Sequence, residues 1–330
     1  MPAIDAAGEF ETIERLFAPL AHPEWGRGLK DDVAVLPSRP GYDLILTKDA
    51  IVEGVHFLPD DPLDTVAKKL LRTNLSDLAA KGAEPFGYLL ACHWSERCGW
   101  PEREAFAEGL KADQEQFGVW LMGGDTVSTP GPASFSATLL GWAPKGAAVA
   151  RSGARPGDVV LVTGEIGDGR LGLEAARDRL SLEDERLQVL AARYRTPEPR
   201  VDFAPMVREH ATAAIDVSDG LVADLGHIAA ASGVAIAIDL ERTPLSRAAL
   251  AWMEQRVDPL AVWVELATGG DDYEIAFTCP PRVVEPLKRE AARQRLRLTQ
   301  IGEVGMGSGV TARFEGKAVD VPSPGWRHGP

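Results

Sequence analysis

Aspartates recur beside glycine near the ends of apolar runs in this sequence, and their side chains could bind metal ions. The apolar run 44–46 reads as a short buried strand that ends where Thr47 and Asp49 begin a polar stretch. Because strand ends converge in space and the loops there carry sites, we expect several such acids to meet. The acids considered together are Asp32, Asp49, Asp77, Asp125, Asp216 and Asp219.

Carboxylates that converge in this way would repel one another unless they were protonated or bridged by cations. Two like charges at about 4 Å repel by roughly 1 kcal/mol in water and by about 4 kcal/mol at an intermediate effective dielectric. Several such pairs would strain a domain whose whole stability is about 5–15 kcal/mol. Oxygen ligands without histidine or cysteine suit Mg²⁺, which completes its shell with water and phosphate. The pattern therefore indicates a Mg-nucleotide or phosphoryl-transfer site.

Each acid cluster taken alone also has a purely structural explanation. Asp-Gly and Gly-Asp pairs form turns, and an aspartate before a helix is usually an N-cap. Asp77 could likewise be a solvated helix residue. The recurrence of the clusters beside apolar runs is what favours a site.

Two known phosphate-binding loops can be tested against the sequence. No Gly-x-x-x-x-Gly-Lys-Ser/Thr run exists, which excludes a P-loop. Residues 167–172 do fit the dinucleotide-binding pattern Gly-x-Gly-x-x-Gly, after a strand and at the start of a helix. The acid expected about twenty residues later, at the end of a second strand, is missing, because residues 183–185 lie in a polar, helix-like stretch. We therefore interpret this segment as a strand-to-helix turn.

Composition narrows the class of protein. A length of 330 residues suits two domains, and a formal charge of −14 disfavours a binder of duplex nucleic acid. Three cysteines favour a reducing compartment, and Cys92, His93 and Cys98 lack the second ligand pair of a zinc site. No basic and apolar leader and no apolar run of about 20 residues is present. We expect a soluble, cytoplasmic protein that binds neither nucleic acid nor membrane.

Strands alternate with helices in both halves, which predicts an α/β (α+β) fold with two domains. The break in pattern between residues 144 and 157 suggests a boundary, with domains at 1–147 and 148–330. The expected strands lie at 33–36, 44–46, 86–92, 119–122, 133–142, 159–162, 213–216 and 275–277, and the expected helices at 10–20, 63–83, 101–117, beyond 169, at 181–194 and from 220 through 228.

The chain resembles the thiamine-monophosphate kinase family, part of the ATP-binding superfamily that includes aminoimidazole ribonucleotide synthetase. Each shared motif is weak alone, but their order along nearly the whole chain is specific. The motifs are Gly-Glu-Phe (8–10), Asp-Asp (31–32), Val-Glu-Gly-Val-His-Phe (52–57), Asn-Leu-Ser-Asp-Leu-Ala-Ala (74–80), Gly-Gly-Asp-Thr (123–126), Arg-Ser-Gly-Ala (151–154), Ile-Asp-Val-Ser-Asp-Gly (215–220) and Gly-Asp-Asp-Tyr-Glu (270–274).

This resemblance implies transfer of the γ-phosphoryl group of ATP to the phosphate of thiamine monophosphate, with several Mg²⁺ ions. It also implies a homodimer whose core is the mixed sheet of the N-terminal domain, followed by a C-terminal α/β domain. The substrate phosphate is already an oxyanion, so we expect metal and electrostatic catalysis without a catalytic base. The implied metal ligands are Asp32, Thr47, Asp49, Asp77, Asp125, Asp216 and Asp219, the nucleotide contacts Gly124, Asp125, Arg151 and Ser218, and the thiamine contacts His56, Asp271 and Trp326.

The chain departs from the family pattern at two lysines. Lys30 stands where the family has glycine before the paired aspartates, so the turn there lacks glycine's freedom. Lys48 stands where the family usually has a threonine that helps to bind metal, and an ammonium group cannot ligate Mg²⁺. Either the backbone carbonyl takes that part, or Lys48 offsets charge in place of one ion. On the second hypothesis, Lys48→Thr would keep activity and change the Mg²⁺ dependence.

Two alternatives compete with this interpretation. A sibling ATP-dependent enzyme could act on another small phosphate or amide, although segments 52–57 and 271–274 argue against it. A non-catalytic Mg-nucleotide sensor or structural paralogue is also conceivable, and the near-complete set of acids argues against that class. Trp326 could stack on a cationic ring, a contact worth roughly 0.5–2 kcal/mol, or could simply cap the surface near the C-terminus.

Overall fold

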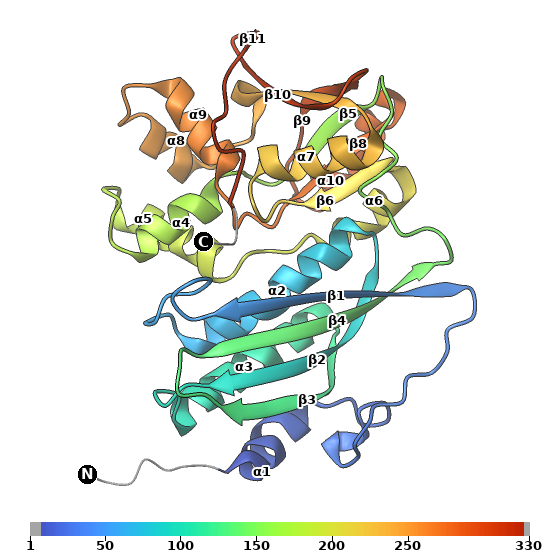
Figure 1. Cartoon of the computed structure of the whole chain (residues 1–330), viewed down its shortest axis with the longest axis vertical. Helices are drawn as coiled ribbons and strands as arrows, with labels where there is room; N and C mark the ends of the chain where they lie inside the picture. The colour runs from blue at the N-terminus through green and yellow to red at the C-terminus, as the bar shows by residue number, and fades with distance from the viewer. Residues whose placement is uncertain (1–7, 327–330) are drawn as a thin grey trace. The chain divides into compact units, whose positions relative to one another are not determined.

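The computed structural model describes residues 8–326, which form two compact units. The N-terminal unit contains the chain up to Leu78 together with Glu84–Gly146, and the C-terminal unit contains Ala79–Ala83 and the chain from Ala147 onward. Each unit has its own β-sheet with helices, which confirms the predicted mixed α/β class (Figure 1). Within residues 8–326, no helix is both long and apolar enough to cross a bilayer.

The N-terminal unit is built on a mixed four-stranded sheet. The strand order is β1-β4-β2-β3, in which β4 runs antiparallel to both of its neighbours and β2 runs parallel to β3. The helices α2 and α3 both lie on one face of this sheet, behind it in Figure 1. The elements are β1 (Tyr42–Val52), α2 (Leu63–Ala80), β2 (Glu84–Trp94), α3 (Trp100–Phe117), β3 (Trp120–Ser128) and β4 (Ser134–Pro144).

Side-chain alternation along the strands decides which residues meet the helices. In β2, Tyr88 and Trp94 are buried, and the Trp94 ring packs edge-on against Phe106 of α3 with ring centroids 5.4 Å apart. On the opposite face Leu46 of β1 and Leu89 of β2 are 58% and 43% exposed. The sheet therefore has one face packed on helices and one face, the open face, that carries exposed apolar residues.

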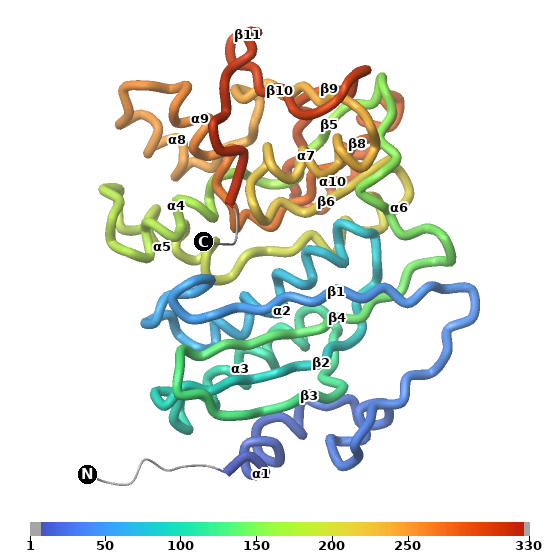
Figure 2. The backbone as a smooth tube through the Cα atoms, in the orientation of Figure 1, coloured from blue at the N-terminus to red at the C-terminus, as the bar shows by residue number. Residues whose placement is uncertain are grey.

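The segment before β1 is less regular than its sequence suggests. The expected amphipathic helix divides into α1 (Glu9–Thr12), a π-helical turn η1 (Ile13–Phe17) and a 3₁₀ turn η2 (Ala18–Leu20). A further 3₁₀ turn, η3 (Arg27–Leu29), leads into an open loop that Figure 2 traces to β1. The strand expected at 33–36 is wrong, because this stretch forms no strand and has a single backbone bond to Trp25, from the N–H of Val35.

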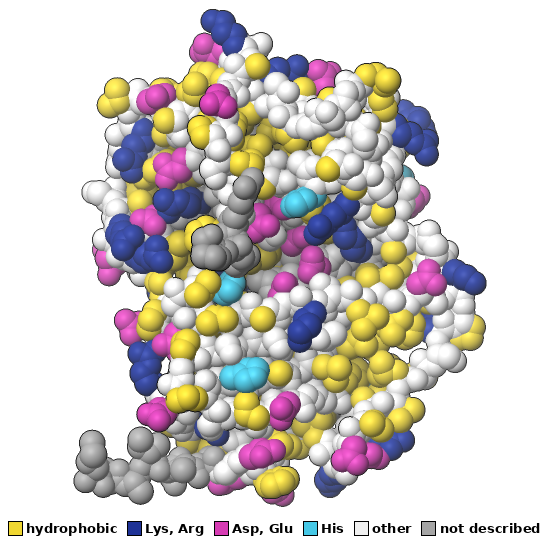
Figure 3. Space-filling view, in the orientation of Figure 1, with side chains coloured by type: hydrophobic (Ala, Val, Ile, Leu, Met, Phe, Trp, Pro, Cys, Tyr) yellow, Lys and Arg dark blue, Asp and Glu magenta, His cyan; other side chains and the backbone are white. Residues whose placement is uncertain are grey.

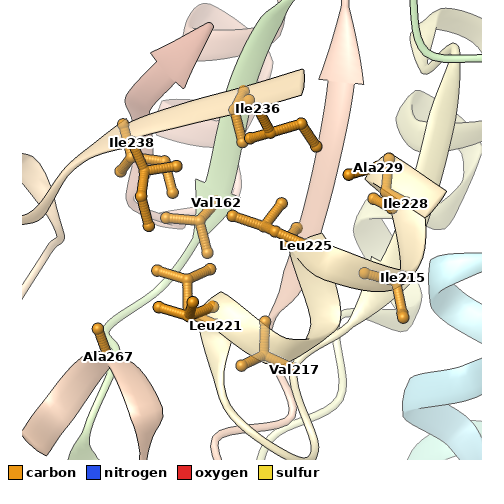
Figure 4. Packing of buried hydrophobic residues seen from close by; sticks show 14 of the residues in the cluster. Val162, Ile215, Val217, Leu221, Leu225, Ile228, Ala229, Ile236, Ile238 and Ala267 are labelled. Carbon is orange, nitrogen blue, oxygen red and sulfur yellow. The ribbon is translucent and has the colours of Figure 1, made fainter. Parts of the chain in front are cut away.

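The C-terminal unit contains a seven-stranded sheet in the order β11-β10-β7-β9-β5-β8-β6. Helix α7 covers one part of this sheet, and its Leu221 and Leu225 point toward Val162 of β5 and Ile238 of β7 in a tightly packed apolar core (Figure 4). The strands are β5 (Val159–Thr163), β6 (Ala213–Asp216), β7 (Ala235–Asp239), β8 (Ile275–Cys279), β9 (Leu298–Gly305), β10 (Gly309–Phe314) and β11 (Lys317–Ala318).

The remaining elements of this unit connect the strands and form its periphery. A second apolar cluster joins α4 and α5 to α8 and α9, with Leu190, Trp252 and Leu266 buried in it. The helices are α4 (Asp168–Ala176), α5 (Asp184–Arg195), η4 (Val201–Phe203), α6 (Ala204–His210), α7 (Leu221–Ser232), η5 (Leu240–Arg242), α8 (Arg247–Met253), α9 (Pro259–Thr268), η6 (Pro281–Val283) and α10 (Val284–Arg293).

Candidate active site

Three of the predicted metal ligands meet between β1 and α2 in the N-terminal unit. The Thr47 hydroxyl donates a hydrogen bond to Asp77 Oδ2 at 2.5 Å. The backbone N–H of Asp49 donates to Asn74 Oδ1 at 3.0 Å, which fixes β1 against the helix. Burial and the charge of Asp77 raise the pKa of Asp49 to about 6. A cation bound beside these two carboxylates would relieve the repulsion between their charges.

We had expected Asp49 to lie at the end of its strand. It lies inside β1 instead, because the strand continues to Val52. Successive strand residues point to opposite faces, so Thr47 and Asp49 face α2 while Lys48 lies on the open face. There the Lys48 ammonium group donates to Ser136 Oγ on β4 at 3.2 Å. The hypothesis that Lys48 replaces a cation beside Asp49 is therefore wrong for this arrangement.

We expect Lys48→Thr to leave the Mg²⁺ dependence of the protein unchanged. The side chain is separated from Asp49 and Asp77 by the thickness of the sheet, and the partner that it loses, Ser136, lies on the open face. A titration of rate against Mg²⁺ concentration for the variant and the wild type measures this. A shifted Mg²⁺ midpoint would mean that Lys48 does reach the metal ligands.

Asp125 belongs to a different part of the sheet. It lies inside β3, in register with Ala91 of β2, and its side chain is on the open face. β1 and β3 are the two edges of the sheet and three strand spacings apart, which is about 14 Å. The structure therefore does not bring Asp125 together with Asp49 and Asp77 of the same chain.

Asp125 instead lines a cavity with Asp32, one of the other predicted ligands. This cavity has a volume of about 380 Å³, and its wall combines the acids with apolar side chains such as Phe17 and Met122. Gly124 also lines it, with φ of +158° and its backbone against Leu90, so that a Cβ would lie 1.8 Å from the Leu90 carbonyl oxygen. Only glycine fits there, which explains one residue of the Gly-Gly-Asp-Thr motif.

A second group of predicted residues meets in the C-terminal unit, around the turn between β6 and α7. Asp216 is the last residue of β6 and is buried, as we had expected for an acid at a strand end. The backbone N–H of Asp271 donates to the Ser218 carbonyl at 2.9 Å. The backbone N–H of Trp326 donates to the Asp219 carbonyl, also at 2.9 Å. The turn thus joins proposed metal, nucleotide and thiamine residues.

Sequence reasoning missed two residues of α7 that lie beside this turn, Asp224 and His227. Asp224 Oδ2 accepts hydrogen bonds from the backbone N–H groups of Ser218, Asp219 and Gly220, each at 3.1 Å. Burial and the charge of Asp219 raise the pKa of Asp224 to about 7. Possible ligand atoms of Asp219, Asp224 and His227 lie within 4.8 Å of one another. The positions of these residues just before α7 and in its first turns could have identified them from the sequence.

The backbone of Arg151 lies away from the turn between β6 and α7. Its carbonyl accepts from Ser232 Oγ at 3.4 Å, and Ser232 is the last residue of α7. Helix α7 has 12 residues and is therefore about 18 Å long, so Ser232 and Asp219 flank opposite ends of it. This contact concerns only the backbone of Arg151, so the nucleotide contact that the resemblance implies for its side chain stays a prediction.

His56 lies in the turn after β1, in the N-terminal unit. Its Nδ1 accepts a hydrogen bond from the Val52 backbone N–H at 3.1 Å, which assigns the proton of a neutral ring to Nε2. Gly54, with φ of +81°, allows the chain to turn between them. The imidazole is half-buried and fixed in orientation, as a contact for a ligand requires.

The Gly167–Gly172 pattern is confirmed as a strand-to-helix turn between β5 and α4. The backbone N–H groups that bind a phosphate in a dinucleotide site bind a side chain of the same protein here. Both carboxylate oxygens of Asp272 accept from the Gly167 N–H, at 2.9 and 3.0 Å, and Oδ1 also accepts from the Gly169 N–H at 2.9 Å. A buried carboxylate thus occupies the place that a pyrophosphate takes in a dinucleotide site.

Comparisons with family models cover most of the chain. The model described as AIR synthase related protein, N-terminal domain, matches residues 30–143, and that of the C-terminal domain matches residues 155–315. A thiamine-monophosphate kinase from Caulobacter vibrioides is 50% identical over 329 residues, which is 99% of this chain and 93% of the relative. One from Salmonella typhimurium is 41% identical over 279 residues, with 83% of both chains covered.

Solved structures agree with these matches. The thiamine-monophosphate kinase of Stenotrophomonas maltophilia has a TM-score of 0.79 and 36% identity, covering 88% of this chain and 91% of that one. AaThiL complexed with AMPPCP and TMP has a TM-score of 0.78 and 33% identity, covering 97% of both chains. Escherichia coli HypE, a hydrogenase maturation protein, shares the fold at 19% identity and a TM-score of 0.74, covering 95% of this chain and 97% of that one.

Proposed function

The chain belongs to the thiamine-monophosphate kinase family, and from that premise we propose that it transfers the γ-phosphoryl group of ATP to the phosphate of thiamine monophosphate, by an in-line reaction assisted by Mg²⁺. Its relative AaThiL has a solved structure in complex with AMPPCP, an ATP analogue, and TMP, thiamine monophosphate. The observation in this chain that carries the proposal is the contact of Thr47, Asp49 and Asp77, a group of oxygen ligands with one carboxyl pKa raised to about 6.

Hard cations are what this chemistry needs. Two phosphate groups that meet in line carry several negative charges, and bound Mg²⁺ neutralises that charge and orients the reacting oxygens. Carboxylates and a hydroxyl are suitable ligands for it. The acceptor phosphate needs no base, so the residues of the chain bind the metal ions and the substrates and orient them. The proposed ligands are Asp32, Thr47, Asp49, Asp77, Asp125, Asp216 and Asp219.

The substrates have separate sets of contacts. We assign the nucleotide to Gly124, Asp125, Arg151 and Ser218, of which Gly124 presents its backbone in the cavity beside Asp32. We assign the thiamine group to residues that offer a ring surface, a carboxylate and a fixed imidazole. Trp326 is 60% exposed and can therefore stack on a ring. The carboxylate of Asp271 and the Nε2 of His56 complete this set.

A homodimer formed through the open face of the N-terminal sheet belongs to the same proposal. Figure 3 shows hydrophobic side chains spread over this sheet, and Leu44 and Leu46 are 40% and 58% exposed. A sheet face in contact with water normally carries polar residues at alternate positions. Contiguous exposed apolar residues mark an interaction surface.

We expect Leu46→Glu to convert a dimer into monomers, because each interface would then bury two unpaired carboxylates. Sedimentation velocity of the wild type and the variant measures this directly. Val257→Glu is the matched control, since Val257 is 100% exposed in the C-terminal unit and should leave the mass unchanged. A wild-type monomer, or a Leu46→Glu variant that remains a dimer, would contradict the proposed interface.

The function itself is tested by product formation. The wild-type protein with ATP, thiamine monophosphate and Mg²⁺ should produce thiamine diphosphate, and the same mixture with excess EDTA should not. With ATP made chiral at its γ-phosphorus, in-line transfer should invert the configuration. Retention would rule out a single in-line step. Tight binding of ATP without turnover would favour the sensor, and turnover only with another phosphate or amide would favour a sibling enzyme.

A further inference from the structure

In the loop 269–274, half-buried and buried residues alternate from Asp271 to Glu274. Asp272 and Glu274 are buried, with 8% and 0% of their surface exposed. Asp271 and Tyr273 are half-buried. Both have positive φ, of +68° and +52°. Two non-glycine residues in this conformation, separated only by Asp272, cost of order 1–3 kcal/mol each, so the surrounding structure must hold them there.

The buried pair supplies that constraint. Asp272 binds the N–H groups at the start of α4, as described above. Glu274 accepts from the Arg200 guanidinium and from the Thr163 hydroxyl at 2.7 Å, and Arg193 lies 3.3 Å from it. These contacts fix the backbone on both sides of Tyr273, so that the direction of its side chain is determined.

The Tyr273 hydroxyl donates to Asp271 Oδ1 at 3.1 Å. We propose that Tyr273 is a positioning residue that orients the Asp271 carboxylate toward the acceptor substrate. This inference rests on the proposed function, in which Asp271 contacts thiamine monophosphate. The hydroxyl acts through Asp271 and need not touch the substrate.

The chemistry of the pair defines what it selects. An ionised carboxylate can accept several hydrogen bonds, so the bond from Tyr273 leaves capacity for a ligand. A carboxylate held in one orientation favours a phosphate ester whose other end carries a cationic ring or an amino group. Without the hydroxyl, the carboxylate would have to be ordered during binding, which weakens the affinity for that end of the substrate.

Tyr273→Phe tests this with the loss of one hydroxyl and little change in shape. We expect KM for thiamine monophosphate to rise about tenfold, as for loss of a hydrogen bond to a charged group, while KM for ATP and kcat stay close to the wild-type values. Tyr88→Phe is the matched control, since Tyr88 is buried in the N-terminal unit and should leave both KM values unchanged.

A double-mutant cycle separates positioning from a structural role. Asp271→Gly removes the carboxylate at a positive φ that glycine adopts without strain. In that background, Tyr273→Phe should cause no further rise in KM for thiamine monophosphate. An additive rise, or an unchanged KM in Tyr273→Phe alone, would overturn this inference and leave the proposed function standing. A wild type without turnover of thiamine monophosphate would contradict the proposed function, and this inference with it.

Discussion

Asp77→Asn should lower the rate of phosphoryl transfer by about 100-fold or more, the loss typical of removing a key electrostatic group. Asp77 accepts from Thr47 and lies close enough to Asp49 to raise its pKa, so its charge belongs to the same group of oxygen ligands. The asparagine oxygen can still accept from Thr47 but cannot neutralise a cation. Steady-state rates at saturating ATP and thiamine monophosphate measure the loss.

The same variant also has a distinct expected effect on stability. Without metal, Asp77→Asn removes one of two carboxylates that disfavour each other's charge, so in EDTA it should unfold at the wild-type temperature or above. Mg²⁺ should then stabilise the variant less than the wild type. Asp64→Asn is the control, because Asp64 lies in the first turn of the same helix and forms a partly exposed pair with Lys68. Full activity in Asp77→Asn would contradict the assignment of a metal site to Thr47, Asp49 and Asp77.

Glu274→Gln should reduce the free energy of unfolding by about 3 kcal/mol, because removing one partner of a buried ion pair leaves the other charge uncompensated. Glu274 is fully buried and binds Arg200, whose side chain is only 11% exposed. The amide keeps one accepting oxygen where the carboxylate has two, and it carries no charge. Equilibrium unfolding in urea, with unchanged slope, measures the loss.

An exposed ion pair in the same unit gives the comparison. Glu265 lies 3.3 Å from Arg170 and its side chain is 42% exposed. Glu265→Gln should cost less than about 1 kcal/mol, as is usual for pairs in contact with solvent. Similar losses in the two variants would mean that Glu274 does not anchor the loop that carries Asp271 and Tyr273.

The sequence predicted acids at the ends of strands, and the structure agrees with this only in part. Asp216 does end its strand, whereas Asp49 and Asp125 lie within β1 and β3. Lys48 and Asp125 lie on the open face of the N-terminal sheet, while Asp49 faces α2. A strand with one exposed face can accept polar residues, so polarity did not mark where β1 or β3 stopped. The apolar pattern at 33–36 predicted a strand where the chain forms a loop, because apolar residues alone do not supply a partner strand.

The contacts between distant segments could not be predicted from local pattern. Asp272 binds the turn at Gly167, 105 positions earlier, and Glu274 binds Arg200, 74 positions earlier. The segment 167–172 was predicted to be a strand-to-helix turn, which is confirmed, but the sequence did not predict that the Asp272 side chain binds its N–H groups. Local spacing also could not tell that Lys48 lies on the face opposite to Thr47, until β1 was known to be one continuous strand.

The central claim is that the acceptor is the phosphate of thiamine monophosphate, and release of ADP from Mg-ATP tests it most directly. Thiamine monophosphate and unphosphorylated thiamine are compared at equal concentration with the wild-type protein. We predict ADP release that depends on thiamine monophosphate, with thiamine giving no more than the rate without an acceptor. ADP release that depends on thiamine alone would contradict the claim and assign the chain to a different kinase reaction.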